Sequence, residues 1–152
     1  MDNQARETGI LPRIEKALHA FVLADRDLLH PGSNLRTIAC RMALCVQDQF
    51  PEAKVDSEFN LDGEGLRKTL IDPEHILSDD LTGESAYPDV VVHHRGTGPR
   101  ILVIEIQRMA SEAVRKNELA KLVRIKEEYA FGGALLINFG TPEKPLEGID
   151  WV

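Results

Sequence analysis

One stretch, residues 87–108 (YPDVVVHHRGTGPRILVIEIQR), constrains the fold of this chain more than any other. It contains two apolar runs, Val90–Val92 and Ile101–Ile106, and both are rich in β-branched residues, which favour strands. Between the runs lies a cluster of turn-forming residues, Arg95–Pro99. The pattern predicts a β-hairpin with a loop of about three to five residues.

This hairpin brings two carboxylates together if its loop is symmetric about Thr97. In that register Asp89 lies opposite Glu105, and opposed residues have Cβ atoms about 4.5–5.5 Å apart. Gln107 lies two residues beyond Glu105 and shares its face. Two carboxylates this close repel each other, so they need a proton, a cationic side chain or a metal between them. Oxygen ligands suit Mg²⁺ or Mn²⁺ rather than zinc, and a slip of one residue would separate the pair.

At these residues the chain resembles the PD-(D/E)XK nuclease superfamily. Pro88-Asp89 matches the PD element, and the EIQ sequence that begins at Glu105 matches (D/E)XK with glutamine in place of lysine. The resemblance is closest to small bacterial single-domain proteins that read roughly PDIVIHKRG…LLVIEIKK, and it extends over residues 33–139. It implies an α/β fold with a mixed central β-sheet flanked by α-helices, an αβββαβ core, and Mg²⁺-dependent hydrolysis of phosphodiester bonds.

The resemblance also implies a set of metal ligands. Asp89 and Glu105 would bind Mg²⁺ or Mn²⁺ directly, together with the backbone carbonyl of Ile106. Glu58 would contribute through a water molecule. The metal would lower the pKa of a bound water and neutralise charge in the transition state.

Glu58 belongs to a stretch, KVDSEFN, that alternates between apolar and polar residues. The alternation predicts a half-buried strand with Val55, Ser57 and Phe59 on one face and Asp56 and Glu58 on the other. On this basis alone the two acids would be solvated. The stretch also resembles the VD-x-EYN segment of the small bacterial family, where the glutamate joins the acidic site, and that resemblance brings Glu58 to Asp89 and Glu105.

Gln107 is the departure from the family's motif, because the usual lysine positions or activates the attacking water. A glutamine can orient that water but supplies no positive charge. The helix predicted after the hairpin contains a Lys-Leu pair like one that the related family often has near the middle of this helix. We therefore expect Lys121 to be the relocated catalytic cation, with Arg108 and Lys116 as further candidates. The alternative is that Lys121 is an ordinary surface lysine.

Apolar periodicity and turn signals predict the elements around the hairpin. Residues 10–24 and a second stretch from Ser33 or Asn34 to Phe50 have the spacing of amphipathic helices. A third helix is expected over residues 111–128, ended by Gly132-Gly133. Residues 134–139 read as a strand buried on both faces, hence central in the sheet and joined to the hairpin by a parallel crossover. We expect the tail to Val152 to be loop-like, with Ile149 and Trp151 packed onto the body.

Length and composition predict one soluble domain, residues 1–152. The chain is 43% hydrophobic and 28% charged, as in ordinary globular domains. No apolar run is as long as a membrane span, which needs about 18 residues. The polar N-terminus MDNQARETGI lacks the apolar core of a signal peptide. Cys40 and Cys45 would lie on different faces of a helix, so we expect free thiols and a cytoplasmic protein. Because no apolar run is long enough to span a membrane, we expect no membrane partner.

The distribution of charge bears on nucleic acid as a partner. A net charge of −7 argues against a nucleic-acid binder, whose surface is usually basic. Residues 108–126, however, carry six basic and two acidic side chains. That segment is either a phosphate-binding surface or an ordinary solvated helix face. Residues 72–84 carry five acidic side chains and no lysine or arginine, and we expect a loop there that points away from any nucleic acid or moves aside.

Two hypotheses follow. The first is a Mg²⁺-dependent phosphodiesterase or nuclease that acts on DNA or RNA, with Asp89, Glu105, Gln107 and Lys121 as its catalytic residues. The second is a catalytically inactive nuclease fold that serves as a binding or scaffold module, favoured by the acidic net charge and the missing lysine. A homodimer is compatible with either hypothesis.

Overall fold

The computed structural model describes residues 8–61, 87–96 and 98–152. The predicted acidic loop at residues 72–84 lies outside this part of the chain. Within it, the elements in chain order are α2 (Ile10–Asp25), the short 3₁₀ helix η1 (Arg26–Leu29), α3 (Leu35–Gln49), β1 (Lys54–Ser57), β2 (Val90–His93), β3 (Arg100–Arg108), α6 (Glu112–Glu128), β4 (Phe131–Phe139) and β5 (Leu146–Trp151). None of these helices is long and apolar enough to cross a membrane.

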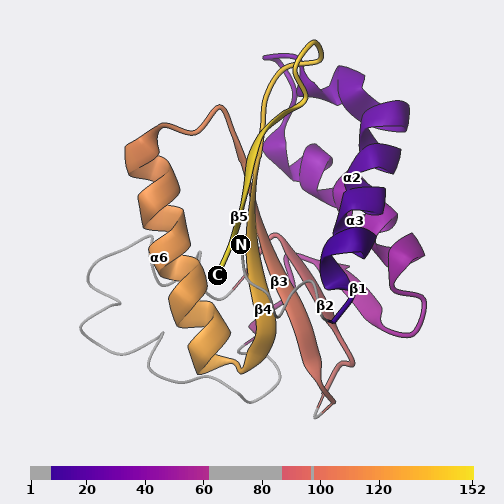
Figure 1. The fold of residues 1–152 in the computed structure, drawn as a ribbon, viewed down its shortest axis with the longest axis vertical. Helices are drawn as coiled ribbons and strands as arrows, with labels where there is room; N and C mark the ends of the chain where they lie inside the picture. The colour runs from indigo at the N-terminus through magenta and orange to yellow at the C-terminus, as the bar shows by residue number, and fades with distance from the viewer. Residues whose placement is uncertain (1–7, 62–86, 97) are drawn as a thin grey trace.

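The strands form one five-stranded mixed sheet in the order β1-β2-β3-β4-β5. β3 and β4 are parallel, and every other neighbouring pair is antiparallel. The helices α2 and α3 cover one face of the sheet, and α6 covers the other (Figure 1). The protein therefore has the predicted α/β fold, and the predicted crossover from β3 through α6 to β4 is confirmed as parallel.

Alternation along β3 divides its side chains between two apolar cores. Ile104 and Ile106 pack in the core beneath α2 and α3, whereas Val103 packs in the core beneath α6. Because successive strand residues point to opposite faces, Glu105 and Gln107 face α6. The apolar pattern of the strand thus aims its two polar side chains at one helix.

The hairpin formed by β2 and β3 has the register predicted for a symmetric loop. The pairs that share this register are Val90–Ile104, Val91–Val103 and Val92–Leu102. An irregularity follows at His93, which pairs with Arg100 and lies on the loop side of these pairs. The irregularity does not affect the register at the open end of the hairpin. The residue pair that follows Val90–Ile104 in this register is Asp89–Glu105.

Side-chain caps begin two of the helices where the sequence predicts them. The Asn34 carboxamide accepts a hydrogen bond from the backbone N–H of Arg36 at 2.7 Å, and α3 starts at Leu35. The Ser111 hydroxyl accepts one from the N–H of Val114 at 3.2 Å, ahead of α6. Each cap satisfies a backbone donor that has no partner within the helix.

The last residue of α6 is Glu128 as predicted, but the prediction that Gly132-Gly133 ends the helix is wrong. After the helix, Ala130 rather than a glycine takes the left-handed backbone conformation, with φ 55°. Gly132 and Gly133 belong to β4. A Cβ atom on Gly132 would lie 3.1 Å from the carbonyl oxygen of Ile101, so glycine allows β4 to approach β3 closely.

The prediction of a loop-like tail is also wrong. Residues Leu146–Trp151 form β5, which pairs with β4 at the edge of the sheet. Ile149 and Trp151 pack against the core as expected. Asp150 accepts two hydrogen bonds of 2.8 Å from the guanidinium group of Arg115. This contact ties β5 to α6, and the same arginine holds the pKa of Asp150 below its usual range.

Candidate functional site

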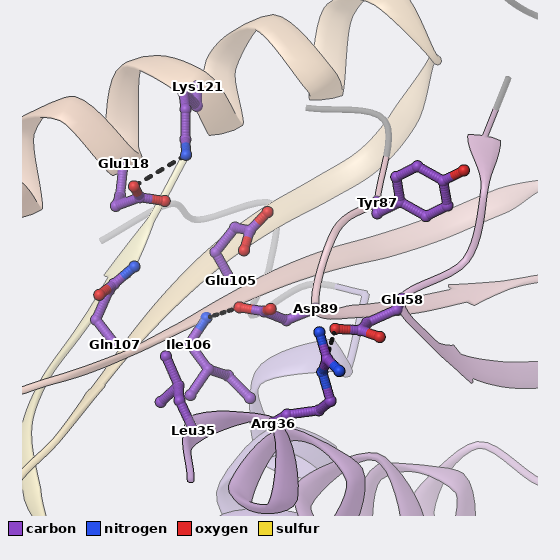
Figure 2. Close-up of a pocket in the computed structure, with 10 residues that line it drawn as sticks. All are labelled: Leu35, Arg36, Glu58, Tyr87, Asp89, Glu105, Ile106, Gln107, Glu118 and Lys121. Carbon is purple, nitrogen blue, oxygen red and sulfur yellow. Dashed lines mark hydrogen bonds and ion pairs between the residues drawn. The ribbon is translucent and has the colours of Figure 1, made fainter. Parts of the chain in front are cut away.

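A cavity of about 610 Å³ opens where β2 begins, between the first turn of α3 and the middle of α6. Figure 2 shows the side chains around it. Its lining consists of Leu35, Arg36, Glu58, Tyr87, Asp89, Glu105, Ile106, Gln107, Glu118 and Lys121. Among them are the predicted metal ligands Asp89, Glu105, Ile106 and Glu58 and the predicted catalytic residues Gln107 and Lys121. The fold therefore gathers residues that lie as far apart in the sequence as Leu35 and Lys121.

Asp89 lies immediately before β2, at the point where β3 extends beyond its neighbour. Its Oδ2 atom accepts a hydrogen bond from the backbone N–H of Ile106 at 2.8 Å. In a strand the N–H and C=O of one residue point toward the same side, so the carbonyl of Ile106 faces the same edge as Asp89. Two of the predicted metal ligands are thus adjacent.

Glu105 lies opposite Asp89 and is almost fully buried, with 7% of its surface exposed. Burial raises its pKa well above the usual range, and the neighbouring charge of Asp89, a hydrogen bond with Asp89 and the charge of Glu118 raise it further. The positive charge of Lys121 lowers this pKa but does not offset the other effects. The charge of Asp89 thus disfavours the ionised form of Glu105, as expected for two carboxyl groups this close.

Glu58 reaches the cavity in a way that the alternating pattern does not predict. β1 ends at Ser57, and Glu58 has the left-handed backbone conformation, with φ 51°. As a result Val55 packs in the core beneath α2 and α3, and Phe59 packs in the core beneath α6, so the prediction that they share a face is wrong. The Glu58 N–H donates to the carbonyl oxygen of Asp89 at 3.2 Å, which fixes the residue beside the carboxyl pair.

The side chain of Glu58 is engaged by Arg36, from the first turn of α3. Arg36 Nε donates to Glu58 Oε1 at 3.0 Å. Both side chains are largely in solvent, with exposed fractions of 71% for Arg36 and 44% for Glu58. We call this contact the outer ion pair.

A second ion pair lies on the α6 side of the cavity. Lys121 Nζ and Glu118 Oε1 are 3.0 Å apart, and the side chains are 12% and 13% exposed. We call this contact the inner ion pair. In Figure 2 the carboxyl groups of Asp89 and Glu105 lie between the inner and the outer pair. Lys121 is therefore a cavity residue rather than an ordinary surface lysine.

The two further candidates for a relocated cation lie elsewhere. The guanidinium group of Arg108 donates to the carbonyl oxygens of Leu29, His30 and Ser33, at 2.7, 2.9 and 3.2 Å. It thereby holds the connection between α2 and α3 against the end of β3. Lys116 is exposed on α6. Neither residue lines the cavity that contains Asp89 and Glu105.

Gln107 lines the cavity beside Glu105, and its side chain extends from β3 toward α6 (Figure 2). Its carboxamide has no hydrogen-bond partner within residues 8–61, 87–96 and 98–152. Such an amide can both donate to and accept from a ligand or a water molecule.

Three polar cavity residues, Arg36, Tyr87 and Glu118, carry no predicted role. Glu118 is three positions before Lys121 on the predicted helix, a spacing that allows side chains to meet, and this is the one signal that could have found it. Arg36 and Tyr87 reach the cavity through tertiary contacts, for which the sequence has no local pattern.

Most of the basic segment at residues 108–126 is used within the protein. Arg115 binds Asp150 and Glu112, and Lys126 donates to the carbonyl oxygen of Val152 at 2.8 Å. Lys121 is in the inner ion pair. Within the described part of the chain, Lys116 and Arg124 are the basic residues of this segment with no ion pair or side-chain hydrogen bond.

The cavity lining fits a divalent cation in charge and in donor type. It contains four carboxylates, Glu58, Asp89, Glu105 and Glu118, and two cations, Arg36 and Lys121. Oxygen atoms are the donors that Mg²⁺ and Mn²⁺ prefer. Across the described residues, no three histidine, cysteine, aspartate or glutamate side chains are close enough together to hold a metal ion. Asp89 and Glu105 are the two carboxyl groups that lie opposite each other, and the carboxylate of Glu58 is engaged by Arg36.

Comparisons of the chain with models of protein families, with curated proteins and with solved structures find no match.

Proposed function

We propose that this protein is a Mg²⁺- or Mn²⁺-dependent phosphodiesterase, a nuclease of PD-(D/E)XK type that acts on DNA or RNA. The observation that carries the proposal is the pair of opposed carboxyl groups, half-buried Asp89 and buried Glu105, inside a cavity that also contains Gln107 and Lys121. A buried carboxyl group with a raised pKa and a charged partner, lying in a cavity, is typical of functional sites.

Asp89 and Glu105 would hold the metal, together with the carbonyl of Ile106, which faces the same edge of β3. Glu105 would lose its proton when the cation binds, because the cation replaces the proton as the partner of the two carboxylates. When bound, the metal supplies a water of lowered pKa and neutralises charge on the phosphoryl group.

Gln107 and Lys121 would act on the water and on the phosphate. The free carboxamide of Gln107 can orient the attacking water by a hydrogen bond but cannot stabilise a hydroxide as an ammonium group does. Lys121 supplies the positive charge, and Glu118 holds its ammonium group at the α6 side of the cavity. A fixed charge in a site of low exposure needs little rearrangement during the reaction.

A binding or scaffold module is the second candidate. It is favoured by Gln107 at the motif lysine position and by the internal use of most basic residues in the 108–126 segment. In that case the cavity would bind a ligand without cleaving a bond.

Calorimetry with Mn²⁺ and cleavage assays on single- and double-stranded DNA and RNA test the proposal. We expect wild type to bind Mn²⁺ and Asp89→Ala to lose both binding and cleavage. Glu15→Gln removes an exposed acid of α2 that does not line the cavity, so this control should bind like wild type. Unchanged Mn²⁺ binding in Asp89→Ala would exclude Asp89 as a ligand. Metal binding without cleavage of any of the four substrates would favour the scaffold.

A further inference from the structure

The outer ion pair leaves most of the Arg36 guanidinium group unused. It joins α3 to the residue after β1, yet it engages one nitrogen of Arg36 and one oxygen of Glu58. The two terminal nitrogens of the Arg36 guanidinium have no partner among the described residues. Figure 2 shows the guanidinium group on the side of the cavity where Asp89 and Glu58 lie.

We infer that Arg36 is the phosphate-binding residue of this cavity and that Glu58 acts as a latch, which withholds Arg36 from phosphate until a metal draws the carboxylate away. The coupling to metal rests on the proposed function, whereas the competition between Glu58 and phosphate for Arg36 does not. The ligand class is a phosphate mono- or diester, recognised through its oxygen atoms.

The chemistry of the two groups supports the competition. A guanidinium group presents parallel N–H donors that match two oxygens of a phosphate, and this bidentate geometry is stronger than a single contact. Glu58 occupies Nε alone, and the pair is exposed to solvent, where an ion pair contributes little. A phosphate can therefore displace Glu58 at small cost.

The charge of the cavity explains why metal should come first. Without a cation the lining has four carboxylates against two basic residues, so it disfavours an anion. A divalent cation at Asp89 and Glu105 neutralises this excess negative charge and attracts Glu58, whose N–H already bonds to the carbonyl of Asp89. The guanidinium group that Glu58 leaves is then available to the phosphate. Metal and phosphate would raise each other's affinity by equal factors.

A titration of metal-free protein with inorganic phosphate in EDTA, monitored by ³¹P NMR, tests the latch without metal. Glu58→Gln should bind phosphate about two- to fivefold more tightly than wild type, the range set by an exposed ion pair. Adding Arg36→Gln to Glu58→Gln should abolish the gain. Glu52→Gln is the matched control, because it removes the carboxylate that pairs with another solvent-accessible arginine, Arg13. Neither Glu52 nor Arg13 lines the cavity.

Equal phosphate affinity of wild type and Glu58→Gln, with unchanged thermal unfolding of both, would overturn the latch. A gain that survives Arg36→Gln would overturn Arg36 as the phosphate ligand.

Calorimetry with Mn²⁺ alone tests the coupling. Arg36→Gln frees Glu58, so this variant should bind Mn²⁺ about two- to fivefold more tightly than wild type. Binding equal to that of wild type would overturn the coupling. If wild type binds no Mn²⁺, the proposed metal site and the coupling both fail, and the metal-free phosphate titration decides the role of Arg36 independently.

Discussion

The inner and the outer ion pair have the same length and differ in their surroundings. Nitrogen and oxygen are 3.0 Å apart in both, but the side chains are 12% and 13% exposed in the inner pair and 71% and 44% exposed in the outer pair. Attraction between charges is weak in water and stronger where water is excluded, although burial also costs solvation. Equal geometry therefore gives a fixed contact beside α6 and an exchangeable contact beside α3.

The difference assigns different tasks to the two sides of the cavity. A catalytic charge has to be in place before the reaction, and the inner pair provides one in Lys121. A binding group has to become available when its ligand arrives, and the outer pair provides one in Arg36. The carboxyl pair of Asp89 and Glu105 lies between them (Figure 2).

The largest effect is expected from breaking the inner pair. Lys121→Ala removes the catalytic charge and leaves Glu118 without its cation, next to Glu105. Cleavage should fall about 100-fold or more, and the free energy of unfolding should fall by about 3 kcal/mol, as when one partner of a buried ion pair is removed. Single-turnover assays and urea unfolding measure the two effects. Full activity in Lys121→Ala would leave the metal and Gln107 to account for the chemistry.

The next effect concerns the pH dependence of stability, which the carboxyl pair controls. The pKa of Glu105 is higher in the folded protein than the ordinary value of 4.5, because the side chain is buried beside Asp89 and Glu118. The stabilisation by its proton is complete below the unfolded-state pKa and is lost as pH rises through the folded-state pKa. Glu105→Gln does not titrate, so its melting temperature should exceed that of wild type increasingly from pH 5 to pH 8. A difference that stays constant with pH, measured in EDTA, would contradict this.

A smaller effect is expected from adding a cation near the inner pair. Gln107→Lys restores the motif lysine on the face of β3 that carries Glu105. If Lys121 is the catalytic cation, activity should stay similar or rise by up to about tenfold. If wild type is inert, weak metal-dependent cleavage in Gln107→Lys would show that the geometry is intact and that charge alone was missing. A Gln107→Leu control keeps the volume but removes the hydrogen bonds.

The smallest effect is expected at the outer pair. Arg36→Ala and Glu58→Gln should each change the free energy of unfolding by less than about 0.5 kcal/mol, because both side chains are solvated. Urea unfolding of both variants beside Lys121→Ala measures the contrast directly. Comparable losses at the two pairs would remove the distinction between a fixed and an exchangeable contact.

Local sequence patterns predicted much of this protein. The β-branched runs and the turn residues between them determine the hairpin and its register, and that register alone brings Asp89 opposite Glu105. Caps at Asn34 and Ser111 and the apolar run of residues 134–139 locate two helices and an inner strand of the sheet. These features depend on residues close in sequence, so their physical causes can be read from the sequence.

Other features of the protein depend on contacts between residues that are far apart in the chain, and only the tertiary structure decided them. The edge strand β5 is defined by its hydrogen bonds to β4, Ala130 rather than a glycine turns the chain after α6, and a left-handed residue carries Glu58 out of β1. The two ion pairs have similar charges and lengths, and their exposure follows from how α3 and α6 pack on opposite faces of the sheet. Sequence determined which charged groups the chain contains. Packing determined which of them water can reach, and hence which contact is fixed and which can exchange.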